Sequence, residues 1–168
     1  MKFQTITNAD LDLWTRMQTD SVMMEHLGGP QPKERMPQIF KNTMKVVEDN
    51  SGWIYKVIDD SVKPEVVVGS VVLWETEHEG KPTVEMGWMI LPEFQGQGWG
   101  KRSVRAVLDK VKAEGRWDVI HAYPAVSNAA SNGICRSTGF TLLGEREFDY
   151  LGRKLVCNDW QIDLRSER

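Results

Sequence analysis

Three glycines in five residues, at positions 96, 98 and 100, form the stretch whose spacing best fits a chemical role. The full run reads Gln95-Gly96-Gln97-Gly98-Trp99-Gly100-Lys101. Glycines let a backbone turn tightly and approach a ligand without Cβ atoms in the way. If a helix begins here, its first turn adds unpaired N–H groups and a partial positive charge. The stretch therefore predicts an anion site, and most naturally a phosphate site.

The spacing of these glycines excludes two nucleotide-binding motifs. A dinucleotide fingerprint requires G-x-G-x-x-G, whereas the third glycine here comes one residue early. A Walker A loop requires G-x-x-x-x-G-K-[ST], whereas Gly100-Lys101 is followed by Arg102 and position 95 is Gln. The pattern that does fit is Q-x-x-G-x-G, running from Gln95 through Gly98 to Gly100.

That pattern resembles the acetyl-CoA pyrophosphate loop of the GNAT N-acetyltransferase superfamily. Three other stretches are similar to the family in the same order along the chain. They are Asp20 to Pro30, similar to the stretch between the first two helices of the RimJ/RimL-like branch; Glu85-Met86-Gly87-Trp88, similar to its fourth strand; and Asn128-Ala129-Ala130-Ser131 with Gly139-Phe140, similar to the second GNAT motif. The four matches cover most of the chain.

The resemblance implies a fold and a set of cofactor contacts. The fold is a single GNAT-type α/β (α+β) domain over residues 1–168, with a central mixed, mostly antiparallel sheet of about six to seven strands and helices on both faces. The implied ligand is acetyl-CoA, with no metal. Its pyrophosphate would meet the loop from Gln95 and Gly96 through Gln97, Gly98, Trp99 and Gly100 to Lys101. Its pantetheine arm would pair with the backbone of Trp88, Met89 and Ile90.

Asn128 has two interpretations that the sequence leaves open. One is a side-chain hydrogen bond to the cofactor, and the other is capping of the helix that follows. The position of Trp99 is also open, because its ring would start a helix either facing solvent or packing beneath the cofactor.

Glu85 is the candidate base that takes the proton of the acceptor amine. On a strand it shares a face with Gly87 and Met89. Flanked by apolar Val84 and Met86, its carboxylate would be desolvated, which raises a carboxyl pKa toward useful values. The alternative is a Glu paired with a cation or exposed near the start of the strand. Other bases that the sequence leaves open are Glu25, His26, Glu75 and His121.

Cys135 departs from the family pattern. Many GNAT enzymes carry a tyrosine seven residues after the Asn of the second motif, where it protonates the leaving thiolate. A thiol at Cys135 is a weak candidate for that acid, because its ordinary pKa is close to that of the leaving group. The competing interpretation is a small buried apolar residue, in which case water serves as the acid.

The elements that position these residues follow from hydrophobic periodicity and turn residues. Apolar Val104, Val107, Leu108 and Val111 predict a helix from the glycine loop to Gly115. Other expected helices cover about 7–17, 33–48 and 128–138. Strands are expected at 3–6, 53–58, 66–74, 84–90, 119–123, 140–148 and 154–164, with turns at Glu79-Gly80-Lys81-Pro82 and Tyr150-Leu151-Gly152-Arg153.

Composition narrows the class of protein. A net charge of −3 and a sequence pI near 5.7 argue against nucleic-acid binding. No apolar run is long enough to span a membrane and no signal peptide is evident, so a cytoplasmic location is the expectation. Two cysteines, Cys135 and Cys157, predict free thiols, and three scattered histidines suggest no metal site.

These observations predict an acetyl-CoA-dependent N-acetyltransferase in which the acceptor amine attacks the thioester directly. No G-x-S-x-G elbow or readable Cys-His arrangement supplies an enzyme nucleophile. The acceptor is either a protein N-terminus or a small amine such as a polyamine, amino acid or aminoglycoside. The alternative function is a catalytically silent CoA-binding regulatory module, suggested by the cysteine at position 135. The oligomeric state is open, with a dimer possible.

Overall fold

A computed structural model describes residues 1–150 and 152–165. A seven-stranded sheet runs in the order β1-β2-β3-β4-β5-β7-β6. The β4–β5 pair is parallel and the other neighbouring pairs are antiparallel, which confirms the expected mixed sheet. The strands are β1 (Lys2–Thr5), β2 (Gly52–Asp59), β3 (Val66–His78), β4 (Lys81–Ile90), β5 (Val119–Ala122), β6 (Thr141–Tyr150) and β7 (Arg153–Asp163).

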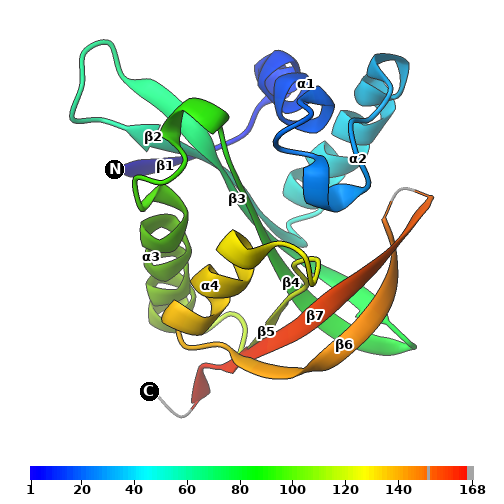
Figure 1. The fold of residues 1–168 in the computed structure, drawn as a ribbon. Coiled ribbons are helices and arrows are strands. Elements are labelled where there is room, and N and C mark those ends of the chain that lie inside the picture. The colour runs from blue at the N-terminus through cyan, green and yellow to red at the C-terminus, as the bar shows by residue number, and fades with distance from the viewer. Residues whose placement is uncertain (151, 166–168) are drawn as a thin grey trace.

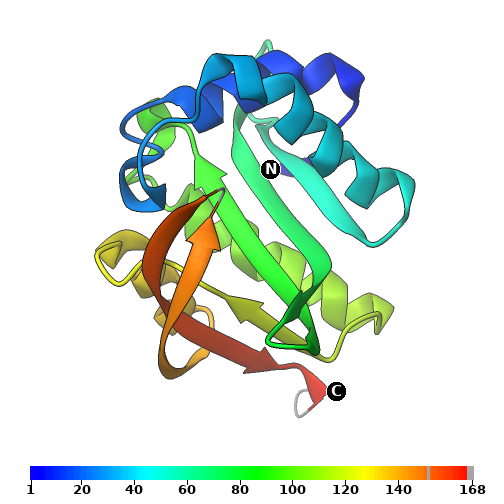
Figure 2. The ribbon, with the colours of Figure 1, turned by 90° about the vertical axis from the view of Figure 1, so that its right-hand side faces the viewer.

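Among the described residues, α-helices cover both faces of this sheet (Figures 1 and 2). They are α1 (Leu11–Thr19), α2 (Met36–Glu48), α3 (Trp99–Glu114) and α4 (Ala129–Ser137). The larger core cluster joins the sheet to α3 and α4, with Val104 and Val107 fully buried. A second cluster joins α1 and α2 to the other face, through residues such as Trp14 and Phe40. Helices on both faces therefore bury both sides of the sheet, as expected.

Helix α3 matches its sequence pattern closely. The four predicted core positions, Val104, Val107, Leu108 and Val111, are all buried. Gly115 follows the last helical residue with a φ of 64°, a left-handed conformation that glycine adopts without a Cβ penalty. Amphipathic spacing and a glycine stop are local properties of the sequence, which explains why both ends of this helix were predictable.

The β3–β4 hairpin extends further than its sequence pattern predicts. Its turn is only Glu79 and Gly80, both with positive φ, so that Pro82 lies inside β4 opposite Glu77. Leu91, which pairs with Val68 in the same register, donates its N–H to the Val68 carbonyl at 2.9 Å. Because hydrogen-bonding pairs alternate along an antiparallel ladder, the backbone of Pro82 faces away from β3. The missing N–H of proline therefore costs no bond in this ladder.

The remaining boundaries differ from expectation by a few residues. Short 3-10 turns at Asn8–Asp10 and Lys33–Arg35 precede α1 and α2, which start later than predicted. Strand β5 ends at Ala122, one residue early. Strands β6 and β7 form the expected hairpin, but Leu151 in its turn lies outside the described residues. Among the described residues, no helix is long and apolar enough to cross a membrane.

Candidate active site

The sheet opens between β4 and β5. The two strands are paired in register at Glu85 and His121 alone, whereas β4 pairs with β3 along the whole length of β4. Hydrogen-bonding pairs alternate along the β3–β4 ladder. The N–H and C=O groups of Glu85, Gly87 and Met89 therefore point toward β3. The backbone groups of Trp88 and Ile90 therefore face the open edge, beyond the last pair with β5.

Of the three residues expected to pair with the pantetheine arm, only two therefore have main-chain groups at the open edge. Trp88 and Ile90 lie on the open edge with their main chain available, although the Ile90 carbonyl accepts a hydrogen bond from Gln95 Nε2 at 2.9 Å. The Met89 main chain turns toward β3 instead, so the structure does not bring it to that edge. This distinction could not be predicted from sequence because it depends on the pairing register of two strands. The Trp88 indole nitrogen is buried and has no hydrogen-bond partner among the described residues.

The glycine loop joins β4 to α3 and is held by its own side chains. The Gln97 amide donates to the Glu93 carbonyl at 3.0 Å, while Gln95 reaches back to β4. Gly96 and Gly98 have φ values of 72° and 79°, a region that favours glycine. A Cβ atom built on either would meet no atom within 4 Å, so the loop presents open space there. Both features fit close approach by a phosphate group.

Gly100 has a different reason to be glycine. A Cβ atom at this position would lie 2.7 Å from Ile134 Cδ1 and 3.6 Å from Ile90 Cγ1. The residue therefore lets the start of α3 pack closely on α4 and on the end of β4. That packing fixes the position of the first turn of α3, whose unpaired N–H groups lie next to the loop and can bind an anion.

Trp99 packs inward instead of facing solvent. Its side chain is buried in the larger core cluster, and the Arg102 guanidinium lies 4.2 Å from the ring centroid. The neighbouring Lys101 is exposed. Trp99 thus anchors the start of α3 beneath the loop, while its backbone remains part of the helix N-terminus.

Glu85 lies where the sheet opens, on the face opposite α3. Its side chain is 22% exposed, and burial raises the pKa of its carboxyl group to about 7. The expected desolvation is therefore present. Its Oε2 atom lies 3.2 Å from Nε2 of His78, a residue at the end of β3. A carboxyl group with this pKa can exchange a proton with an amine near neutral pH.

His121, opposite Glu85 in the strand pairing, is held by side chains of β7. Its Nδ1 lies 2.7 Å from Asp159 Oδ1, and its Nε2 lies 3.1 Å from Gln161 Nε2. Asp159, 1% exposed, also accepts from Arg146 Nε at 2.6 Å. Both nitrogens of His121 are therefore engaged away from Glu85.

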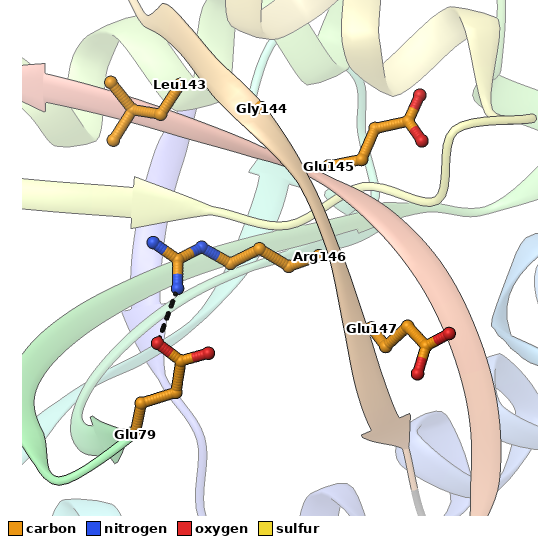
Figure 3. A pocket seen from close by; sticks show the side chains of 6 residues that line it. All are labelled: Glu79, Leu143, Gly144, Glu145, Arg146 and Glu147. Carbon is orange, nitrogen blue, oxygen red and sulfur yellow. Dashed lines mark hydrogen bonds and ion pairs between the residues drawn. The ribbon is translucent and has the colours of Figure 1, made fainter.

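Arg146 continues this network to the surface. Figure 3 shows its side chain extending from β6 toward Glu79, which it contacts at 3.0 Å. The two residues border a surface hollow of about 400 Å³, whose other lining residues come from β6 (Leu143, Gly144, Glu145 and Glu147). The hollow is formed by the outermost strand and a hairpin turn, and its lining includes neither the glycine loop nor Glu85.

Asn128 and Cys135 have structural positions that account for them. Asn128 Oδ1 accepts from the Ser131 N–H at 3.0 Å, which is the capping interaction. Cys135 is fully buried in the larger core cluster, and burial raises the pKa of its thiol to about 12. A weak acid held in the core is poorly suited to protonating a leaving thiolate.

Of the other candidate bases, two contact side chains other than Glu85 and a third is exposed. Glu75 accepts from the Trp117 indole N–H at 2.8 Å, and His26 Nδ1 lies 3.0 Å from Ser127 Oγ. Glu25 is exposed in a short 3-10 turn. Of the titratable side chains considered from the sequence, Glu85 and His121 are the two that the β4–β5 pairing brings together.

Two buried polar residues escaped the sequence analysis. Asn132 accepts from Asn158 Nδ2 and Trp160 Nε1 at 2.7 and 2.8 Å, which ties α4 to β7. Gln18 Nε2 lies 3.6 Å from Met89 Sδ, while its Oε1 accepts from Tyr150 at 3.3 Å. Neither side chain belongs to a sequence motif, since each is recognised only by the partners that folding brings to it.

Comparison with known proteins assigns the chain to a family. A family model described as an acetyltransferase (GNAT) domain matches residues 1–141. No curated protein sequence matches significantly. Among solved structures, the chain is similar to a spermidine N-acetyltransferase from Vibrio cholerae in complex with CoA and spermine, with a TM-score of 0.77, 19% identity and coverage of 97% of this chain and 95% of that one.

Two other similar structures carry different acceptor names. A ribosomal-protein-S5-alanine acetyltransferase from Vibrio fischeri matches with a TM-score of 0.75 and 16% identity, over 99% of this chain and 94% of that one. A ribosomal-protein-alanine N-acetyltransferase from Brucella melitensis matches with a TM-score of 0.73 and 21% identity, over 97% and 99%. At these identities the likeness shows the fold.

Proposed function

Because the chain belongs to the GNAT acetyltransferase family, we propose that it transfers the acetyl group of acetyl-CoA to a primary amine, with Glu85 as the base. The observation that carries the proposal is the desolvated Glu85 carboxyl group, located where β4 and β5 part and with a pKa near 7. We further propose that residues 1–168 act as one domain of the RimJ/RimL-like branch, in the cytoplasm. The branch rests on the Glu85-Met86-Gly87-Trp88 and Asn128-to-Ser131 stretches.

The residues present fit acetyl-CoA, which supplies the activated acetyl group when bound. In the proposal, the N–H groups of Gly98 through Lys101 hold the pyrophosphate at the start of α3. The open-edge backbone groups of Trp88 and Ile90 bind the pantetheine arm as an added strand, and one of their N–H groups stabilises the charge that develops on the carbonyl oxygen. Gln95 holds the loop against β4 by its bond to Ile90.

Glu85 then takes the proton that the acceptor nitrogen loses. A carboxyl group with a pKa near 7 is half ionised at neutral pH, so it is present as a base and still has affinity for a proton. Direct attack by the amine needs no enzyme nucleophile. Cys135 has a packing role in this proposal, and water protonates the thiolate.

The charges around Glu85 favour an acceptor with one amine over a polyamine. Asp159 contacts His121 next to Glu85, but its carboxylate is already paired with Arg146. Glu85 itself is only half ionised at neutral pH because of its raised pKa. A polycation would require several free carboxylates along its length. We therefore propose a peptide or protein N-terminus as the preferred acceptor.

The test is CoA-thiol release from acetyl-CoA with a panel of short peptides, spermidine, amino acids and aminoglycosides. The matched control for each peptide is the same peptide with its N-terminus already acetylated. Release with free peptides alone supports the proposal in full. Release with polyamines alone overturns the acceptor class but keeps the reaction. Binding of acetyl-CoA without release for any amine would instead support the silent binding module.

A further inference from the structure

His78 is a partly exposed side chain in direct contact with the carboxyl group of Glu85. Its Nε2 atom lies 3.2 Å from Glu85 Oε2, and the two side chains are 23% and 22% exposed. The ring is packed edge-on against Tyr123 and Phe148, with both centroid distances 4.9 Å. Two aromatic contacts, one from Tyr123 just after β5 and one from Phe148 in β6, fix the orientation of the imidazole. A residue chosen only to fill space would not need a ring nitrogen aimed at the carboxyl group.

The overall reaction creates a need for such a route. An alkylammonium ion and a thioester give an amide, a thiol and one proton, so one proton must leave the site in every turnover. Burial raises the pKa of the Glu85 carboxyl group, so this group holds a proton more tightly than an exposed carboxyl group does. His121, the other imidazole beside Glu85, has both ring nitrogens engaged by Asp159 and Gln161. His78 is thus the imidazole in contact with the proposed base.

We propose that His78 relays the proton from Glu85 to solvent. Glu85 takes the proton from the acceptor nitrogen, and the carboxyl proton then moves to Nε2 of His78. The ring releases its Nδ1 proton to water, which leaves Glu85 ionised and His78 neutral. Exchange with water returns the ring to its Nδ1–H form before the next turnover. The step consumes no other reactant, and it rests on the proposed role of Glu85.

The surroundings of His78 keep it suited to passing a proton on instead of holding it. Burial lowers its pKa, and the nearby His121 and Arg146 act in the same direction. Asp159 and Glu79 oppose them. Tyr123 and Phe148 supply neutral ring edges. A ring whose pKa is lowered does not retain a positive charge at neutral pH, so it gives the proton up to water.

Two variants separate a relay from a positioning role. His78→Gln keeps a side chain that can hydrogen-bond to Glu85 but relays no proton, whereas His78→Phe keeps a flat ring between Tyr123 and Phe148 and removes that hydrogen bond. The relay predicts that kcat falls by roughly 100-fold in both, the lower end of what a positioned proton-transfer group contributes. It also predicts that added imidazole restores kcat in both variants and leaves the wild type unchanged.

Glu77→Gln is the matched control. It removes a charge next to His78 in the chain, at an exposed residue of β3, and it should retain the wild-type kcat without any response to imidazole. Circular dichroism and acetyl-CoA binding verify that each variant is folded. If His78→Phe does not fold, His78→Gln alone decides the question.

The outcomes also distinguish this inference from the proposed function. If Glu85→Gln is inactive while both His78 variants turn over like the wild type, the relay is wrong and the base assignment stands. Loss of activity in His78→Phe with full activity in His78→Gln would reduce His78 to positioning Glu85. If the wild type acetylates none of the amines tested, the proposed function itself fails.

Discussion

Replacement of Gly98 by Asp, compared with Asn, tests the phosphate loop through one charge. The two side chains have the same shape, and both would occupy the open space found around this position. Gly98 has a φ of 79°, so either substitution carries a left-handed backbone strain of about 1 kcal/mol. The strain is common to both variants and cancels in their comparison.

The added charge acts with opposite signs on the free and the bound protein. Asp at the N-terminus of α3 interacts favourably with the helix dipole by about 0.3–1 kcal/mol, so free Gly98→Asp should be at least as stable as free Gly98→Asn. With phosphate about 5 Å away and an effective dielectric constant of about 20, the same charge is repelled by roughly 3 kcal/mol. That repulsion corresponds to a roughly 200-fold loss of affinity.

The assay is chemical unfolding with and without acetyl-CoA, at a concentration about 100 times the wild-type Kd. Stabilisation should be about 2.7 kcal/mol for the wild type and close to that for Gly98→Asn, but below about 0.5 kcal/mol for Gly98→Asp. Titration calorimetry gives the affinities independently. If Gly98→Asp is stabilised as strongly as Gly98→Asn, no phosphate lies at this loop and its assignment is wrong.

Three other substitutions test the remaining site and its packing. Glu85→Gln should lower kcat/KM by about 10²–10⁴-fold. The wild-type kcat/KM should rise with pH through about 7, an inflection that the variant lacks if Glu85 is the base. The raised pKa also means that unfolding free energy declines as pH rises from the ordinary carboxyl value to about 7, so a urea series in which the variant declines equally would contradict burial of the charge. Gly100→Ala should destabilise by about 1 kcal/mol or more by crowding Ile134, and Ile134→Val in the same chain should recover part of that loss. Cys135→Ala should cost about 1 kcal/mol of stability with less than a few-fold change in kcat; a larger loss in kcat would restore its role as the acid.

Sequence patterns predicted the features that are local along the chain. Three such features are present at the predicted residues: the three-glycine loop, the apolar stripe of α3 and the end of α3 at Gly115. Each depends only on residues that are close together in the sequence. The desolvation of Glu85 was also predicted, but Val84 and Met86, the apolar neighbours behind that prediction, pack on the opposite face of the sheet. Even the hairpin of β6 and β7 was evident from alternation and a turn.

Features that depend on register between strands were out of reach. The contact between Glu85 and His78 requires the hairpin turn to be two residues long, whereas the turn residues suggested four. The distinction between Met89 and Trp88 depends on which residues of β4 form the hydrogen-bonding pairs with β3. Trp99 is similar, since burial of its ring depends on how α3 packs on the sheet.

Because β4 and β5 are paired only at Glu85 and His121, the sheet consists of two halves with little backbone pairing between them. One half of the sheet is a meander of β1 to β4, and the other is β5 with the β6–β7 hairpin (Figure 2). The two halves are tied chiefly by side chains under α3 and α4, not by a backbone ladder. A ligand strand bound at the open edge would complete the ladder, so the amides of Trp88 and Ile90 would report its presence as slowed hydrogen exchange. Release of the product would then remove the hydrogen bonds that link the two halves of the sheet, so the local stability of the sheet would change in each turnover.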